Sequence, residues 1–515
     1  MHPRSRRTPT ARRRPRALAC AAATLAALLT ACGSSGDDGP KGPKDPKGQK
    51  GDERTTAPGG SRSGAPVITP TATAPIPRGK GSKLPDDLNG DGYPELVLPL
   101  VGNEKEPQPT RLAFVHGSSR GVNPATRTVL TRDDLGLPAR DADAPPVDTT
   151  RIATADLDGD GYADLVTPVN ERLSEADSDR LHTTVRTVPY ITWGGADGPR
   201  RGAAATRARL AGPDDSVDLR RPTVGDFDGD GHHDLAMVRA DRKSFLLLYG
   251  PFGRDGRAAR TVPYQSPLDS GGDGDGDISE LFADTIDGDR PTDLVVHAMN
   301  DDDQSASVLL TAGPTGLART GHPLREGNAI AFGDFDGDGL RDVAVGDSGT
   351  RNNEPGYETE APDVDHTLSV YTKKTLKGAP IKIANMAGGL AAADTDGDGT
   401  DELAVALDTG GVELITIQPG SQGSPGSPGD IAGRHTLTRT TPAQVDGEKI
   451  RKTRRAARLY GARDFDQDGK DEVVLAWGRE AVFALYGDRP EWWWITDGTA
   501  DKTAFTAKPF TTDTH

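Results

Sequence analysis

The stretch DLDGDGYAD, at residues 156–164, decides the fold that the sequence predicts. Acidic residues occupy its positions one, three, five and nine, and a glycine occupies position six. Intact copies of this D-x-[DN]-x-D-G-x-x-[DE] pattern lie at residues 87–95, 156–164, 226–234, 334–342, 394–402 and 464–472. Six copies indicate an architecture in which one structural unit is repeated.

A seventh, degenerate copy (DTIDGDRPTD) lies at residues 284–293, with one extra residue early and Arg290 in place of the glycine. The first acidic residues of the seven copies are then 50 to 70 residues apart. Each copy is followed by a short β-rich run, such as LVTPV or LAVAL, and most repeats contain a second apolar run. The period and the runs predict an all-β fold, a seven-bladed β-propeller at residues 81–505 with one four-stranded blade per repeat. We expect a strand from the other end of the chain to close the last blade.

The acidic loops predict bound calcium. Carboxylates at positions one, three and five point inward when the chain curls, and the glycine at position six permits the bend. Oxygen is the only ligand type offered, which favours Ca²⁺ over Mg²⁺ or zinc. Position twelve is never the glutamate that a helical EF-hand needs. We therefore expect about six calcium sites and a degenerate seventh; acidic turns without metal are the alternative.

With these loops the chain resembles the FG-GAP/VCBS repeat proteins, whose propeller is similar to the integrin α-subunit head, over roughly residues 81–500. The resemblance implies that each loop joins the first and second strands of a blade on one face, with ligands bound on the other face. It also implies the metal ligands, with position seven contributing its backbone carbonyl. They are Asp87, Asn89, Asp91, Tyr93 and Glu95; Asp156, Asp158, Asp160, Tyr162 and Asp164; Asp226, Asp228, Asp230, His232 and Asp234; Asp334, Asp336, Asp338, Leu340 and Asp342; Asp394, Asp396, Asp398, Thr400 and Glu402; Asp464, Asp466, Asp468, Lys470 and Glu472; and, in the degenerate loop, Asp287, Asp289 and Asp293.

The N-terminus predicts export. A basic segment and an apolar stretch at residues 1–31 have the pattern of a signal peptide. The stretch ends in Leu29-Thr30-Ala31-Cys32, which resembles the lipobox of bacterial lipoproteins and implies a lipid on Cys32. Residues 32–80, rich in Gly, Pro, Ser, Thr and Lys, are expected to form a disordered tether, and residues 506–515 a C-terminal tail. The predicted location is the outer face of a cell membrane, and the export route stays open. An ordinary cleaved signal is the alternative.

Composition narrows the function classes. The net charge of -17 makes nucleic acid a poor partner. The only catalytic motif visible is GSSRG at residues 117–121, which matches the G-x-S-x-G pattern of a nucleophile elbow. The residues that follow, Val122-Asn123-Pro124, do not suit the helix that such an elbow enters, and so we expect a simple turn. We expect a non-enzymatic, calcium-stabilised, membrane-anchored extracellular binding or adhesion module for an unknown protein or glycan. An extracellular polymer-degrading hydrolase or lyase and a structural envelope lipoprotein are the alternatives.

Two further expectations separate these readings. A binder should expose an aromatic or hydrophobic patch on the face opposite the calcium loops, whereas an enzyme should bring paired carboxylates or a His-Arg-Tyr cluster together in the central funnel. The tryptophan run at residues 492–494 is expected to seal the last blade, with stacking on sugar rings as the alternative.

Overall fold

The computed structural model describes residues 65–100, 111–139, 152–181, 183–210, 218–268, 276–298, 304–350, 363–373, 376, 378, 380–417, 431–479 and 489–512. All of them belong to one compact unit, Gly60–His515. The predicted signal peptide, Cys32 and the tether up to residue 64 lie outside the described residues. Among the residues described, no helix combines the length and the apolar character needed to cross a membrane.

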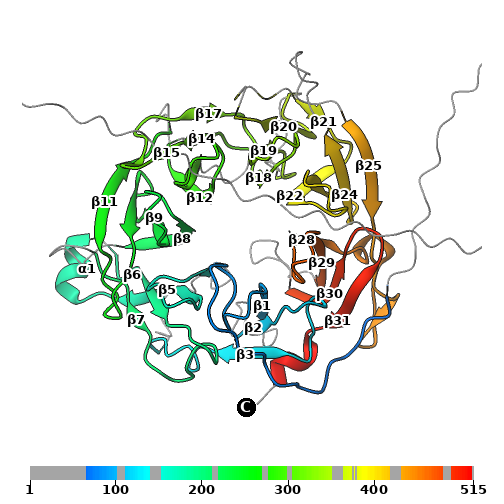
Figure 1. Ribbon diagram of the computed structural model, residues 1–515, viewed down its shortest axis with the longest axis horizontal. Helices are drawn as coiled ribbons and strands as arrows, with labels where there is room; N and C mark the ends of the chain where they lie inside the picture. Colours follow the sequence, from blue (N-terminus) through cyan, green and yellow to red (C-terminus); the bar gives the residue numbers. More distant parts are fainter. Residues whose placement is uncertain are drawn as a thin grey trace, which may run out of the picture. The chain divides into compact units, whose positions relative to one another are not determined.

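Seven antiparallel sheets stand around a ring, and each sheet is one blade of a β-propeller (Figure 1). Six sheets have four strands, paired in chain order, and the sheet of the first blade has three. In each four-stranded blade the first strand lies near the centre of the ring and the last strand at its rim (Figure 1). The all-β, seven-bladed fold that the sequence predicts is therefore confirmed.

The strands of the seven blades have the following bounds. The first blade holds β1 (Leu96–Leu100), β2 (Arg111–Val115) and β3 (Arg127–Thr131); the second β4 (Ala153–Ala155), β5 (Asp164–Arg172), β6 (Val185–Thr192) and β7 (Thr206–Arg207); the third β8 (Leu219–Gly225), β9 (Asp234–Arg239), β10 (Ser244–Tyr249) and β11 (Arg260–Gln265). The fourth holds β12 (Ile278–Asp284), β13 (Asp293–Ala298), β14 (Ser307–Leu310) and β17 (His322–Leu324); the fifth β18 (Ala329–Gly333), β19 (Asp342–Gly346), β20 (Thr367–Tyr371) and β21 (Ile381–Lys382). The sixth holds β22 (Met386–Ala393), β23 (Glu402–Leu407), β24 (Val412–Ile417) and β25 (Ile431–Leu437); the seventh β28 (Arg458–Arg463), β29 (Glu472–Arg479), β30 (Arg489–Thr496) and β31 (Asp501–Thr506). Two small hairpins, β15 (Ala312–Gly313) with β16 (Gly316–Leu317) and β26 (Gln444–Val445) with β27 (Glu448–Lys449), and the short helices α1 (Glu175–Leu181) and η1 (Lys452–Arg454) lie in connections. A third short helix, η3 (Lys508–Thr512), follows β31.

Apolar side chains pack between neighbouring blades, because successive residues of a strand point to opposite faces of its sheet. The tryptophan run on β30 is an example. Trp493 packs with Leu98 of the first blade, and Trp494 packs with Leu414 of the sixth. Both indoles are buried, at 0% and 2% exposed. The prediction that this run seals the last blade is confirmed.

The N-terminal segment closes the ring. The Ile68 N–H donates to the Ala504 carbonyl (2.9 Å), and the Thr506 N–H donates to the Ile68 carbonyl (3.0 Å), so residue 68 pairs with the outer edge of β31. The other end of the chain thus pairs with the last blade, but through one isolated bridge and not through the predicted strand, because the last blade already has four strands of its own.

Residues on the outer side of both predicted propeller boundaries contact the blades. Residues 65–80, predicted to be tether, lie against the first and last blades, and the Ala74 N–H donates to the Ala125 carbonyl at 2.7 Å. In the predicted tail, Phe510 is buried and its ring lies 5.9 Å from that of Phe505. Amino-acid composition does not reveal these contacts, because the segments are held by backbone hydrogen bonds to strand edges. Such bonds need few apolar side chains.

A chain that begins at residue 81 should therefore be less stable than one that begins at residue 65. It loses the backbone hydrogen bonds of Ala65, Ile68 and Ala74 and exposes the edge of β31. We expect a loss of about 2 kcal/mol in the free energy of unfolding, measured by urea denaturation. Equal stability of the two chains would show that residues 65–80 add nothing to the fold.

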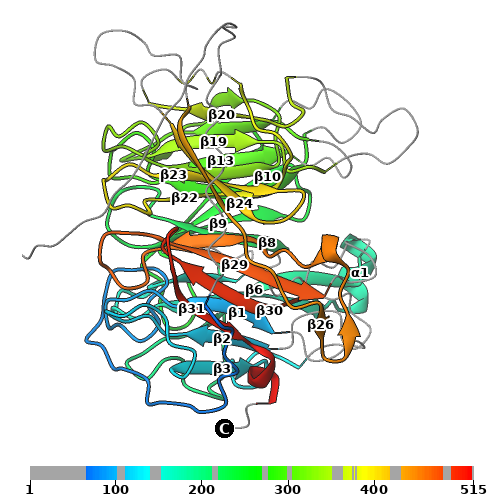
Figure 2. The same cartoon turned by 90° about the vertical axis from the view of Figure 1, so that its right-hand side faces the viewer.

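The antiparallel strands sort the connections onto two faces. All loops from a first to a second strand lie on one face, which we call the acidic face. The connections from second to third strands and those between blades lie on the opposite face. Figure 2 shows α1 and the β26–β27 hairpin, which belong to such connections, on the same side of the propeller.

Candidate metal centre in the acidic loops

Each acidic loop lies where the resemblance implies, before the second strand of its blade. The loop at residues 156–164 runs from β4 to β5, and Asp164, at position nine, is the first residue of β5. Position nine also begins β9, β13, β19, β23 and β29. The first loop precedes β1 in the same way, although no strand is described before it.

Backbone amides hold each loop in its curl. The Asp156 carboxylate accepts the N–H of Gly159 (2.8 Å) and of Gly161 (2.9 Å). The position-six N–H bonds to the position-one carboxylate in all six intact loops. Gly161 has a φ of 90°, which glycine adopts without steric cost. The predicted role of this glycine is confirmed.

The position-nine carboxylates are buried and held from two sides. In the second loop, Asp164 accepts the Leu157 N–H (3.0 Å) and the Gly194 N–H (2.7 Å). Burial raises the pKa of Asp164 to about 7 and that of Glu95 to about 9. The same cause raises the pKa to about 7 for Asp234 and Glu472, about 8 for Asp342 and about 6 for Asp293. Ionising these groups at neutral pH therefore costs free energy unless a positive charge lies nearby.

Carboxylate oxygens gather around the centre of the curl in at least four of the loops. One oxygen each from Asp156, Asp158 and Asp164 lies within 4.8 Å of the other two. Equivalent groups form from Asp87, Asp91 and Glu95, from Asp226, Asp228 and Asp230, and from Asp334, Asp336 and Asp342. Burial, followed by repulsion from Asp160, raises the pKa of Asp158. These groups offer a cation several oxygens at once.

The position-three oxygens test whether these residues fit a metal ion. Asp228 Oδ1 and Asp466 Oδ1 are buried and have no hydrogen-bond partner within the described part of the chain. A buried carboxylate oxygen without a partner is costly, and an ion would relieve this cost. The donor set is oxygen, which suits the hard Ca²⁺ ion. The residues therefore fit calcium.

The first loop holds a side chain that sequence reasoning missed. His116, at the end of β2, places Nδ1 3.0 Å from Glu95 Oε1, and its ring is buried. Burial lowers the pKa of His116 to about 4, so the imidazole is neutral at pH 7. In the strand registers, the residues equivalent to His116 in the next three blades are Trp193, Tyr249 and Thr311, so no repeated pattern in the sequence marks His116.

Basic side chains contact the position-three carboxylate in at least three of the loops, which the sequence also did not predict. Arg254 contacts Asp158 and lies 2.6 Å from Asp160 Oδ2. Arg260 lies 2.7 Å from Asp228, and Lys502 lies 3.6 Å from Asp466. In the loop at residues 394–402, the three carboxylates at positions one, three and five have no basic partner among the described residues. A cation that enters the second, third or seventh loop must compete with a side chain.

The degenerate loop lacks the carboxylate that holds the turn. Asp284 accepts the N–H of the next residue, Thr285, and pairs with Arg341 at 2.8 Å. Lys373 donates to the Asp287 carbonyl, while Asp287 Oδ1 accepts the Asp289 N–H at 2.9 Å. Asp287, Asp289 and Asp293, the ligands predicted for this loop, remain near one another, but no carboxylate takes the role of position one.

Neighbouring loops are bonded to one another around the ring. The position-eight residue of one loop contacts the position-one residue of the preceding loop, as in Asp401 N–H to Asp334 O at 2.8 Å. The junctions are Ala163 with Asp87, His233 with Asp156, Thr292 with Asp226, Arg341 with Asp284, Asp401 with Asp334, and Asp471 with Asp394. In the first loop position eight is Pro94, which has no N–H, and an Arg463–Asp86 pair at 2.8 Å bridges this last junction. The loops thus form a closed chain of contacts between blades.

Two other groups of residues bear on function. Asp347, Asp365 and His366 come together between β19 and β20 on the opposite face. Asp347 accepts the N–H groups of Gly349 and His366, both at 2.7 Å, which gives it a structural role. The GSSRG stretch is a turn, as predicted, in which Ser118 Oγ donates to the Gly121 carbonyl (2.8 Å).

Comparison with known proteins adds likeness of fold alone. A scan against protein-family models finds no match, and a search of curated proteins finds none. Among solved structures, the chain is similar to BBS1N in a crystal structure of its complex with ARL6DN, soaked with lead, at 12% identity and a TM-score of 0.39 over 80% of this chain and 93% of that one. It is also similar to the Dos1 propeller, at 8% identity and a TM-score of 0.34 over 78% and 81% of the two chains. These likenesses carry no argument about function, and the blade count rests on the strand pairing.

Proposed function

We propose that this protein is a non-enzymatic surface binding module of the FG-GAP/VCBS type, stabilised by calcium and anchored to the outer face of a cell membrane through lipidated Cys32. The observation that carries the calcium part is the burial of the position-nine carboxylates beside other loop carboxylates, with pKa values of about 6 to 9. The anchor is supported by the lipobox-like sequence around Cys32.

Positions one, three, five and nine of each intact loop would hold the ion, together with the carbonyl of position seven. Calcium supplies the positive charge that allows the buried carboxylates to ionise. A carboxylate has about four lone-pair sites, so the hydrogen bonds that Asp164 accepts leave room for an ion. The bonds between loops then transmit this stabilisation from blade to blade. In this proposal calcium has a structural role: it stabilises the closed ring of blades, and we call this role the calcium fastener.

The difference between the loops of the two faces supports a binding role for the opposite face. The acidic face is occupied by repeated loops that bond to one another, whereas the connections of the opposite face differ in length and sequence from blade to blade. Variable loops on a rigid scaffold are typical of binding sites. The expected hydrophobic patch is not found, because the exposed large hydrophobics among the described residues, Ile68 and Tyr460, lie at the outer and inner edges of the last blade. The described connections of this face offer mainly polar and charged side chains for the proposed binding role.

Calcium titration of the chelator-treated full chain tests the proposal. We expect uptake of about six ions by isothermal titration calorimetry, with dissociation constants on the order of 10⁻⁴ to 10⁻³ M. Asp396→Asn, in the loop whose carboxylates at positions one, three and five have no basic partner among the described residues, should abolish or weaken one of these sites. Asp289→Asn, in the degenerate loop, is the matched control and should leave the count unchanged. Absence of calcium uptake would remove the calcium part of the proposal.

The side chain of Arg254 gives a prediction of opposite sign. Because Arg254 contacts Asp158 and Asp160, Arg254→Ala should raise the calcium affinity of the second loop, by about three- to five-fold for a half-exposed pair. Arg257→Ala is the control, since Arg257 lies 4.0 Å from Asp255, outside the acidic loops. Weaker binding by the Arg254 variant would show that the arginine supports the site and does not compete with the ion.

A further inference from the structure

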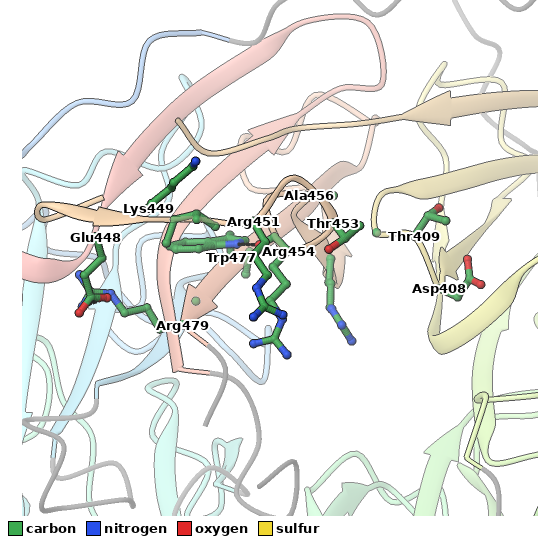
Figure 3. Close-up of a pocket in the computed structure, with 15 residues that line it drawn as sticks. Asp408, Thr409, Glu448, Lys449, Arg451, Thr453, Arg454, Ala456, Trp477 and Arg479 are labelled. Carbon is green, nitrogen blue, oxygen red and sulfur yellow. Dashed lines mark hydrogen bonds and ion pairs between the residues drawn. The ribbon is translucent and has the colours of Figure 1, made fainter. Parts of the chain in front are cut away.

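The opposite face carries a pocket of about 410 Å³ at the junction of the sixth and seventh blades (Figure 3). Its walls come from three places in the sequence. They are the turn between β23 and β24 at residues 408–410, the connection between the blades at residues 448–458, and the end of β29 at residues 476–479. A cavity of this size accommodates a small ligand or one or two units of a polymer.

The pocket is basic in an acidic protein. In residues 448–458 six of eleven side chains are basic and one is acidic, while the whole chain has a net charge of -17. Five basic residues line the pocket against two acidic ones, Asp408 and Glu448. The basic residues are Lys449, Arg451, Arg454, Arg458 and Arg479. This local reversal of charge indicates an anionic ligand.

Part of this charge is not used within the fold. Lys449 and Arg451 are exposed and make no ion pair within the described residues. By contrast, Arg479 is held at one side of the pocket by Glu448 (3.3 Å) and Asp446 (2.5 Å). Figure 3 shows Arg451 and Arg454 beside Trp477, with Asp408 and Thr409 across from them. Arg451 is thus placed between Arg479, a fixed basic side chain, and the neighbouring blade (Figure 3).

The backbone that carries these side chains is fixed. Trp477 Nε1 donates to the Arg454 carbonyl (2.7 Å), and Arg455 Nε donates to the Thr441 carbonyl (2.7 Å). The Gly411 N–H donates to the Ala457 carbonyl, also at 2.7 Å. The indole of Trp477 is mostly buried, its polar atom is satisfied, and its apolar body contributes to the pocket wall. A site held in this way loses little conformational entropy when a ligand binds.

We propose that this pocket binds an acidic sugar, a carboxylate- or phosphate-bearing unit of an anionic polysaccharide. The proposal rests on the binding role proposed above and names the chemistry of its ligand. Arginine presents donors in a planar fork that matches a carboxylate or a phosphate. Asp408 and Glu448 can accept hydrogen bonds from sugar hydroxyls, and the indole wall can contact the apolar face of a sugar ring. A concave pocket of about 410 Å³ fits a sugar unit better than the flat surface of an anionic membrane.

Binding of defined probes to the full chain in calcium tests the proposal. The probes are a galacturonate trisaccharide, glucose 6-phosphate, a neutral galactose trisaccharide, inorganic phosphate and vesicles of anionic phospholipid. We expect the two acidic sugars to bind, and Arg451→Gln to weaken them about ten-fold, the size expected for a charge-assisted hydrogen bond. Arg451→Lys should fall between, because it keeps the charge and loses the fork. Lys452→Gln, one residue along and outside the pocket lining, is the matched control and should change affinity less than about two-fold.

Several outcomes would overturn the proposal. Equal affinity for the neutral and acidic trisaccharides would show that charge does not determine binding. Equal affinity for inorganic phosphate and glucose 6-phosphate would show that the sugar part is not recognised. Vesicle binding that depends on Arg451 while the sugars fail assigns the pocket to lipid. Calcium uptake by the same sample separates the two proposals. Loss of sugar binding with normal uptake refutes the pocket alone, whereas sugar binding without uptake refutes the calcium fastener alone.

Discussion

Treatment with EGTA should lower the melting temperature of this protein by about ten degrees or more at pH 8, and addition of calcium should restore it. With a dissociation constant near 10⁻⁴ M and calcium at about 2 mM, each site stabilises the fold by about 2 kcal/mol. Six sites then contribute on the order of 10 kcal/mol, comparable with the whole stability of an ordinary domain. Because bonds such as Asp401 to Asp334 join neighbouring loops, emptying one loop should weaken the next.

The same experiment at pH 5 should give a much smaller shift. In the metal-free fold, burial raises the pKa of Asp164 to about 7, Asp342 to about 8 and Glu95 to about 9, above the values of an unfolded chain. The folded state therefore binds these protons more tightly, and the stability they give is lost as the pH rises from about 5 to 9. Calcium replaces these protons, and so it stabilises the fold most at the pH values at which the buried carboxylates are ionised.

Differential scanning calorimetry with calcium or EGTA across this pH range measures both effects. Magnesium at the same concentration is the control and should restore much less, because the loops offer an irregular set of oxygens without ordered octahedral geometry. A calcium-dependent shift of equal size at pH 5 and pH 8 would contradict the account based on the position-nine carboxylates. No shift at either pH would exclude structural calcium altogether.

The repeated features of this fold could be predicted from the sequence, because each is local. The position-one aspartate and the position-six glycine bond within one turn, so their spacing alone fixes the curl of the loop. The β-rich runs that follow give one blade per repeat, and the alternation along residues 492–494 gives two buried tryptophans. Each inference needed only residues a few places apart.

The remaining features depend on contacts between distant parts of the chain. Arg254 reaches Asp160 across 94 positions, and Tyr460 donates to the Val97 carbonyl across 363. The basic run at residues 448–458 is visible as a charge cluster, but its meaning depends on Asp408 and Trp477, which belong to two different blades. Nothing in the run itself indicates a concave surface. The contacts of residues 65–80 depend on distant partners in the same way, since residue 68 pairs with residue 505.

Asp501→Ala should destabilise the propeller by about 3–5 kcal/mol, the cost of leaving one charge of a buried pair uncompensated. Asp501 Oδ1 lies 2.6 Å from Arg439 Nη2, and the two side chains are 0% and 9% exposed. The other oxygen, Oδ2, accepts the Ala65 N–H at 2.7 Å, so this carboxylate ties together the N-terminal segment, β31 and the connection between the sixth and seventh blades.

Urea denaturation of the variants, measured in the presence of calcium, distinguishes the buried Asp501–Arg439 pair from an ordinary surface ion pair. Glu413→Ala is the control, because the Glu413–Arg434 pair is half-exposed and should contribute less than about 1 kcal/mol. The double variant Asp501→Leu with Arg439→Met should lose less stability than Asp501→Ala, because it leaves no buried charge behind. Additive losses in the double variant would show that the two residues act independently. Arg439 also precedes the segment that carries the basic pocket, and the Ala457 N–H donates to the Arg439 carbonyl at 2.8 Å. Asp501→Ala should therefore loosen this segment before the blades separate. Faster hydrogen exchange at the Ala457 amide would measure that loosening.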